Sequence, residues 1–192
     1  MSEIKGKHLI GLIKFLASRG PSVSLARVLE ACPNVKPIYD KRISPLLWYP
    51  FAAMVEPMEK YVEIYEQGRE QAFFDMGAAG GQRDVENTYK VVFQGDPNAH
   101  PLDFIKMGDF FWKDSFKNAG SLSVLDVDGN GCVMEIRDFP ELRHPYCRNL
   151  EGWLDFTANA SSRRFTTQVR LEGCIHKDRP TNRYKVAWTP NS

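Results

Sequence analysis

The spacing of apolar residues changes character near residue 120. Before that point apolar residues recur every three or four positions, and after it most of them alternate with polar ones. Leu9, Leu12 and Leu16 predict an amphipathic helix over residues 7–18. The same spacing predicts further helices over residues 22–32, 51–65, 68–79, 84–93 and 101–118, with a proline-rich loop over 33–45.

Two helices contain residues that disturb a helix. Pro57 lies inside the pattern of residues 51–65 and should kink or divide that helix. Gly80 and Gly81 follow the pattern of residues 68–79 and should end it. A turn is predicted at residues 95–98, and Gly120 should end the last helix of this half.

The rest of the chain is typical of a sheet that one helix crosses. Strands are predicted at 121–125, 132–136, 165–171 and 183–188, and a helix at 144–156. Helices followed by strands indicate an α+β fold, in which an N-terminal helical half packs on a C-terminal antiparallel sheet. The length of 192 residues favours a single domain over 1–192, with a helical part over about 1–119 and a sheet part over about 120–190.

The segment from Asp126 to Arg137 resembles a calcium-binding loop in part. Oxygen-bearing side chains stand at its first, third and fifth positions, and a glycine at its sixth. The twelfth position holds Arg137 instead of a bidentate glutamate, and strand patterns flank the loop where helices are required. Asn130 followed by Gly131 between two strands favours a β-hairpin instead.

Composition sets limits on partners and location. Lysine and arginine exceed aspartate and glutamate by only one, so no basic surface for nucleic acid is expected. No apolar run reaches the length of a membrane span, and no signal peptide is apparent. The four cysteines lie far apart in the chain, which favours reduced thiols and a cytoplasmic protein.

Metal ligation and catalysis find limited support in the sequence. Cys147, Glu172 and Cys174, with His144 and His176 nearby, are ligand types that zinc accepts, but their spacing matches no zinc finger or ribbon. No nucleophile elbow, phosphate loop or paired acid and base stands out, so an enzyme is not expected. Buried structural cysteine is the competing interpretation of the cysteines.

Aromatic residues gather in three groups that suit either a core or a greasy pocket. An apolar ligand pocket is predicted between the helix that starts near residue 147 and the sheet, closed by helices from the first half. The residues expected to line it are Trp48, Phe51, Phe111, Cys147, Trp153 and Phe156.

Several short segments together resemble a known superfamily. They are Ile4-Lys-Gly before a helix, Trp48-Tyr-Pro-Phe, a glycine-bearing helix around Gly77, Trp112 with the Gly120 break, Tyr146-Cys147 followed by Gly152, Val169-Arg-Leu-Glu-Gly-Cys174, and Tyr184-Lys-Val-Ala-Trp188. The chain resembles the superfamily of vinyl-reductase-type ligand-binding domains, haem-nitric-oxide-binding-related domains and Bet3-like subunits of the TRAPP complex, and a bacterial branch of it known from myxobacteria.

The resemblance implies a domain, often dimeric, that binds small hydrophobic molecules or partner proteins. Haem-binding members carry a Tyr-x-Ser-x-Arg clamp that is absent here, and His100 lies in a proline-bounded turn, so haem is not expected. Zinc-bearing members supply ligands that Cys147, Glu172 and Cys174 match loosely, and Thr181, Asn182 and Arg183 occupy the region of the final cysteine.

The leading hypothesis is therefore a non-catalytic sensory or scaffolding module. It would bind a small hydrophobic molecule without a cofactor and act through a protein partner or a homodimer contact. Two alternatives stay open: an interaction protein with a filled core, and a zinc- or haem-binding sensor.

Overall fold

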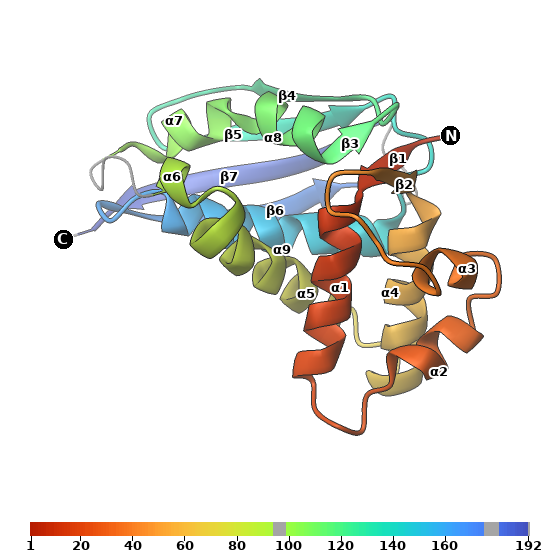
Figure 1. The fold of residues 1–192 in the computed structure, drawn as a ribbon. Coiled ribbons are helices and arrows are strands. Elements are labelled where there is room, and N and C mark those ends of the chain that lie inside the picture. The colour runs from red at the N-terminus through yellow and green to blue at the C-terminus, as the bar shows by residue number, and fades with distance from the viewer. Residues whose placement is uncertain (94–98, 175–180, 192) are drawn as a thin grey trace.

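The computed structural model describes residues 1–93, 99–174 and 181–191, and it has the predicted α+β arrangement (Figure 1). Helices occupy most of the first 115 residues, and a sheet with one long helix follows. The helical elements are α1 (Gly6–Ser18), α2 (Leu25–Glu30), α3 (Lys36–Tyr39), α4 (Ala52–Tyr65), α5 (Gln71–Arg83), the π-helical turn η1 (Asp84–Thr88), α6 (Lys90–Phe93), α7 (Pro101–Lys106), α8 (Gly108–Ser115) and α9 (His144–Ala160).

The main sheet has four antiparallel strands in the order β4-β5-β7-β6. They are β4 (Ser121–Leu125), β5 (Gly131–Arg137), β6 (Phe165–Gly173) and β7 (Asn182–Pro190). The last strand thus lies between β5 and β6, and α9 packs across β6 (Figure 1). This is the crossing helix that the sequence predicts.

The segment from Asp126 to Asn130 is the hairpin connection between β4 and β5. The two strands pair from Ser121 opposite Arg137 to Leu125 opposite Val133. The backbone N–H of Asp128 donates to the carbonyl of Gly131 at 3.0 Å. Strands on both sides exclude the helix–loop–helix frame that a calcium loop requires.

A second, small sheet has the order β2-β1-β3, formed by β1 (Glu3–Lys5), β2 (Trp48–Pro50) and β3 (Phe116–Lys117). The sequence does not predict this sheet, because strands of two or three residues are too short to show alternation. β1 precedes α1 directly and β3 follows α8 directly, so this sheet joins the start of the helical half to the entrance of the main sheet.

Pro57 does not divide its helix, because α4 continues from Ala52 to Tyr65. Proline removes the hydrogen bond to the carbonyl four residues earlier, which belongs to Ala53. The Tyr39 hydroxyl donates to that carbonyl at 2.6 Å. A side chain from α3 therefore satisfies the group that Pro57 leaves without a partner.

Gly80 and Gly81 do not end α5, which continues to Arg83. A Cβ on Gly81 would lie 3.1 Å from the Trp153 carbonyl oxygen and 3.2 Å from the Phe156 Cβ. The glycine is needed for close approach of α9, and the helix accepts its conformational cost.

The predicted helix over 101–118 is two helices with a strand after them. α7 ends at Lys106, and Met107 connects it to α8. A Cβ on Gly108 would lie 2.5 Å from a Leu122 methyl carbon, so α8 packs closely on β4. α9 also extends to Ala160, beyond its predicted end, whereas the turn predicted at residues 95–98 lies outside the described residues.

One face of the main sheet supports both α8 and α9. Met134 and Tyr184 are register partners on β5 and β7, and both are buried. The Tyr184 hydroxyl donates to the Cys147 carbonyl on α9 at 3.2 Å.

α9 also packs so closely against α5 that their backbones are in contact. A Cβ on Gly77 would lie 1.7 Å from the Asn149 carbonyl oxygen, and one on Gly152 would lie 2.1 Å from the Phe74 carbonyl oxygen. We call this contact the α5–α9 seam.

Candidate functional site: a cavity between the helical half and the sheet

An apolar cavity lies where α1, α4, α5, α8 and α9 meet β4 and β5. The space between its wall atoms is about 780 Å³ when the solvent-open mouth is included, but the free cavity inside is only about 70 Å³. The wall is therefore contracted around narrow free space. Its apolar lining includes Leu12, Phe15, Met54, Met76, Phe111, Phe116, Leu122, Met134, Leu150, Trp153 and Leu154.

His8 places an unpaired nitrogen in this wall. The residue lies on α1 and lines the cavity with Gly11 and Leu12, one turn further along the same face. Its Nε2 is buried and has no hydrogen-bond partner. Burial, followed by the charges of Lys7 and Arg83, lowers the pKa of His8 to about 3. The imidazole is therefore uncharged at neutral pH.

Trp112 supplies a second unpaired polar group to the same cavity. It lies on α8, lines the cavity and is 5% exposed. Its indole Nε1 is buried without a hydrogen-bond partner. A buried N–H that makes no hydrogen bond costs about 1–3 kcal/mol. Two such groups in one small cavity are an unusual feature for a plain core.

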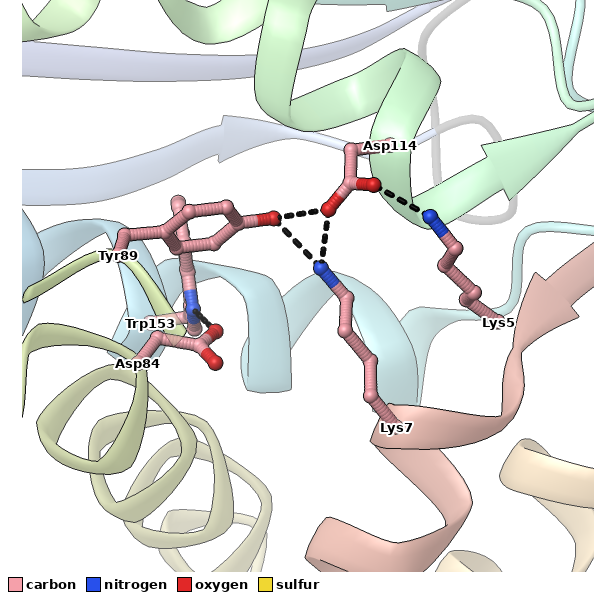
Figure 2. Close-up of polar contacts among 6 residues, drawn as sticks. All are labelled: Lys5, Lys7, Asp84, Tyr89, Asp114 and Trp153. Carbon is pink, nitrogen blue, oxygen red and sulfur yellow. Dashed lines mark hydrogen bonds and ion pairs between the residues drawn. The ribbon is translucent and has the colours of Figure 1, made fainter. Parts of the chain in front are cut away.

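An ion-pair cluster ties α8 to the start of the chain next to this wall (Figure 2). Asp114 on α8 accepts hydrogen bonds from Lys5 of β1, Lys7 of α1 and the Tyr89 hydroxyl, the last two at 2.6 Å. Lys7 also donates to the Tyr89 oxygen. We call these four residues the Asp114 cluster.

The Asp114 cluster shifts the pKa values of its members in opposite directions. Burial alone acts to raise the pKa of Asp114, but the hydrogen bonds from Lys5, Lys7 and Tyr89 outweigh it and hold that pKa well below its usual range. Burial, and then the hydrogen bond to Asp114, raise the pKa of Tyr89 far above its ordinary value. The carboxylate is thus ionised and the phenol neutral throughout the physiological range.

Arg83 and Asp84 complete the polar part of the wall at the end of α5. Asp84 accepts a hydrogen bond from the Trp153 indole N–H at 2.9 Å (Figure 2). The Arg83 side chain lines the cavity, and burial lowers its pKa. Its guanidinium donates to the Gly11 carbonyl at 3.4 Å, and the nearby charge of Asp84 acts against the lowering of its pKa.

The structure separates the aromatic residues predicted to line one pocket. Phe111 and Trp153 do lie in the cavity wall. Phe51 lies against Phe139 and Tyr146 and lines a different hollow. Trp48 lies on β2 with the Lys5 ammonium over its ring, and Phe156 packs its Cβ near Gly81. Cys147 is not among the residues of the cavity wall.

Among the described residues, the predicted zinc ligands do not form a site either. Cys147 and Cys174 are buried with their sulfur atoms 3.6 Å apart, and the Cys147 thiol donates to the Asn182 side chain at 3.3 Å. Hydrogen bonding between the thiols and burial raise the pKa of Cys147, so it stays protonated. Glu172 is exposed. Within residues 1–93, 99–174 and 181–191 no group of three such ligands could hold a metal ion, and His176 lies outside the described residues.

His8, Lys7 and Asp114 are site residues that the sequence does not predict. One signal was present: His8 shares the helical stripe of Leu12 and Phe15, so a polar residue stood on an apolar face. Lys7 and Asp114 carried no signal, because charged residues on helices are usually solvent-exposed.

Sequence comparison with protein-family models and with curated proteins finds no match. Comparison of the fold with solved structures finds strong matches to H-NOX proteins. The Fe(II) unliganded H-NOX protein from K. algicida matches with a TM-score of 0.72 and 9% identity, over 97% of each chain. The H-NOX protein from S. oneidensis in the Fe(II)NO state matches with a TM-score of 0.66 and 12% identity, over 96% of this chain and 99% of that one.

An oxygen-binding H-NOX domain related to soluble guanylate cyclases matches with a TM-score of 0.63 and 18% identity, over 98% of this chain and 95% of that one. These matches support the haem-nitric-oxide-binding part of the resemblance, and not its vinyl-reductase or Bet3-like parts. They also overturn the expectation against haem. A further matching structure comes from work described as probing the function of haem distortion in the H-NOX family. In its architecture, the chain has the fold of the H-NOX proteins.

Proposed function

We propose that this protein is a small-molecule sensor domain that holds haem in the cavity between its helical half and its sheet. The observation that carries the proposal is the apolar cavity itself, placed between the two halves of a fold otherwise seen in H-NOX proteins. The space free inside the wall is only about 70 Å³. Small-molecule sites span roughly 300–1,000 Å³, so the wall would have to open to admit haem.

The residues present fit a haem group chemically. A porphyrin is a flat apolar ring, and the wall offers aliphatic, methionine and aromatic side chains. Haem also bears two carboxylates. Lys7 and Arg83 are cations beside the wall that could pair with them. The unpaired Nε2 of His8 is a nitrogen donor in the same wall. The narrow free space means that side chains must move outward when a guest enters.

When bound, haem would supply an iron atom that can take up a diatomic gas. The chain's own residues would do the rest. Phe111, Leu122 and Met134 would exclude water from the ring. Arg83, which forms no ion pair with a described carboxylate, would bind a carboxylate at the edge of the cavity.

In this proposal, the Asp114 cluster carries a signal from the cavity. It joins α8, which lines the cavity, to β1 and α1 on the opposite side. A guest that separates α1 from α8 would strain or break these bonds, and so favour a second arrangement of the two helices. The readout would be a protein contact, and the partner and homodimer expected from the sequence remain predictions.

Titration of the purified protein with hemin tests the proposal. We expect saturable binding of one hemin per chain, seen as a shifted and sharpened absorption band in the near ultraviolet. The variant Gly80→Leu should block it, because Gly80 lines the cavity and a Cβ there meets no atom closer than 3.6 Å. Its side chain would fill free space without a backbone clash.

Gln82→Leu is the matched control. Gln82 lies on the exposed face of the same helix, so the variant adds the same apolar side chain outside the cavity. Equal hemin binding by both variants, or binding that never saturates, would show that hemin adheres to the surface and would reject the proposal.

A further inference from the structure

The two edges of the main sheet are finished in different ways. The strand order β4-β5-β7-β6 places β4 at one edge and β6 at the other (Figure 1). The outward-facing N–H and C=O groups of an edge strand are a template on which another strand can pair. The partners of these groups at each edge therefore indicate where a further strand can bind.

The β6 edge is sealed by side chains of α9. Three alternate backbone N–H groups of β6 each donate to a side-chain oxygen of this helix. The donors are Thr167, Val169 and Leu171, and the acceptors are Asn159, Asp155 and Glu151, at 2.8, 3.0 and 2.9 Å. Four helical residues rise about 6 Å and two strand residues about 6.7 Å, so the acceptors stay in step with the strand. Another strand cannot pair with an edge whose donors are already bound.

The β4 edge has no such cover. From Ser121 to Leu125 the strand pairs with β5 alone, and no side chain within residues 1–93, 99–174 and 181–191 hydrogen-bonds to its backbone. The strand also lacks the charged residues, the proline and the bulge with which soluble proteins blunt an edge. Five residues is an ordinary length for a strand, so β4 can accept a partner.

Antiparallel pairing of β4 with β4 of a second copy is self-complementary. A two-fold axis at Ser123, the middle residue, lets all five residues pair. Leu122 then faces Val124 of the second copy, which is an apolar pair, and no like charges meet. Because the β6 edge is sealed, copies cannot join head to tail from edge to edge into a fibre, and only the closed contact is available.

We propose that β4 is the interface of a homodimer in which the two main sheets join edge to edge into one antiparallel sheet. Gly120 and Asp126, both with positive φ, bound the strand, so the pairing stops after five residues. Such a contact is small beside the roughly 1,200–2,000 Å² of a stable interface, so the dimer forms only at high protein concentration. The proposal goes beyond the sensor function and holds whether or not the cavity binds haem.

Sedimentation velocity of the haem-free protein over a range of concentrations tests the proposal. Wild-type protein should pass from monomer to dimer as the concentration rises, and no larger species should follow. Ser123→Glu and Ser123→Lys should each weaken dimerisation by about 10-fold or more, because the same charge meets itself across the axis. Leu122 packs on Gly108 of α8, so Ser123 lies on the other face of the sheet and neither replacement enters the cavity wall.

An equal mixture of the two variants distinguishes charge repulsion from a damaged fold. Glutamate on one copy would face lysine on the other, so the mixture should form a heterodimer at least as readily as wild type dimerises. A variant that is monomeric because it is misfolded would not recover in this way. Gln168→Glu is the matched control, because Gln168 is exposed on the sealed strand β6, and it should dimerise like wild type. Circular dichroism melts check the fold of each variant.

Wild-type protein that stays monomeric at every concentration, or that grows into larger species, would overturn the proposal. So would a dimer that the Ser123 variants leave unchanged or that Gln168→Glu weakens, and so would a mixture that stays monomeric. Dimerisation that is lost in each Ser123 variant and recovered in their mixture supports it.

Discussion

The two sides of the cavity are built in opposite ways. On one side, the α5–α9 seam brings backbones into contact at Gly77 and Gly152, where any side chain would overlap a carbonyl oxygen. On the other side, α1 and α8 meet through side chains, and His8 and Trp112 between them are left without hydrogen-bond partners. The seam is closely packed, whereas the α1–α8 side contains buried nitrogen atoms without hydrogen-bond partners.

This difference shows how a fold can hold a cavity at limited cost. Close packing at the seam supplies dispersion contacts and rigidity. The opposite side then tolerates unpaired nitrogens and empty space, each of which costs stability. Unpaired polar atoms and empty space that are confined to one side of a cavity are expected where a ligand binds.

The strongest challenge to this comparison is a methyl group in the seam. Gly77→Ala should lower the free energy of unfolding by about 3 kcal/mol or more, because the new Cβ would overlap the Asn149 carbonyl and force two helices apart. Urea unfolding followed by circular dichroism measures it. Gly129→Ala is the control, because a Cβ there meets no atom within 4 Å, and it should change stability by less than about 0.5 kcal/mol. Similar losses in both variants would mean that the seam is not tightly packed.

Acid should weaken the α1–α8 side of the haem-free protein through His8. The pKa of His8 is about 3 in the fold and near 6.5 in the unfolded chain, so between these values the unfolded chain binds the proton. The protonation of His8 therefore costs no stability above about pH 6.5, and stability is lost as the pH falls below that value, by about 1.4 kcal/mol per pH unit.

Comparison of wild type with His8→Leu isolates the part of the acid-induced loss of stability that is due to His8. Between neutral pH and about pH 5, wild type should lose about 2 kcal/mol more than the variant. Urea unfolding at both pH values measures the difference. Parallel losses in the two proteins would show that His8 reaches water in the fold.

The ties across the α1–α8 side should contribute a smaller amount. Asp114→Asn weakens the hydrogen bonds from Lys5 and Lys7 and should cost about 1–2 kcal/mol. Asp109→Asn on the same helix breaks a solvent-exposed pair with Lys113 and should cost no more than about 0.5 kcal/mol. Thermal or urea unfolding compares them, and faster hemin uptake by Asp114→Asn would indicate that this cluster holds the cavity shut. Equal losses of stability in the two variants would show that the Asp114 cluster does not stabilise the α1–α8 side.

The smallest effect is a gain. Gly80→Ala should raise the free energy of unfolding by about 0.5–1 kcal/mol, because alanine is the better helix former and its Cβ meets only ordinary contacts. Gly81→Ala, one residue on, faces the Trp153 carbonyl at 3.1 Å and should show no such gain. A gain at Gly81 as well would place the edge of the seam further along α5 than its geometry indicates.

Much of the fold follows from local patterns. The change from helical to alternating spacing near residue 120 gives the α+β order, and Asn130-Gly131 gives the hairpin. Where the predictions are wrong, a partner distant in sequence decides the outcome. Tyr39 compensates for Pro57, and the approach of Trp153 explains why a helix runs through Gly81.

The candidate site is less predictable than the fold. Phe111 and Trp153 reach the cavity, but Trp48, Phe51 and Phe156 are aromatic for other packing reasons, and sequence spacing does not separate the two cases. Cys147 and Cys174 do meet, yet as buried thiols without a third ligand among the described residues. His8 is evident only once its missing hydrogen bond is known. None of the helices in the described ranges has the length and hydropathy of a membrane span.

The small sheet has a consequence for the order in which the molecule assembles. β1 stands in its middle, with one neighbour near residue 49 and the other near residue 116. Its hydrogen bonds cannot all form until more than half of the polypeptide has left the ribosome, and closing so long a loop is slow. The first turn of α1, which carries His8, is therefore expected to reach its final position late, after the helices that surround it are in place.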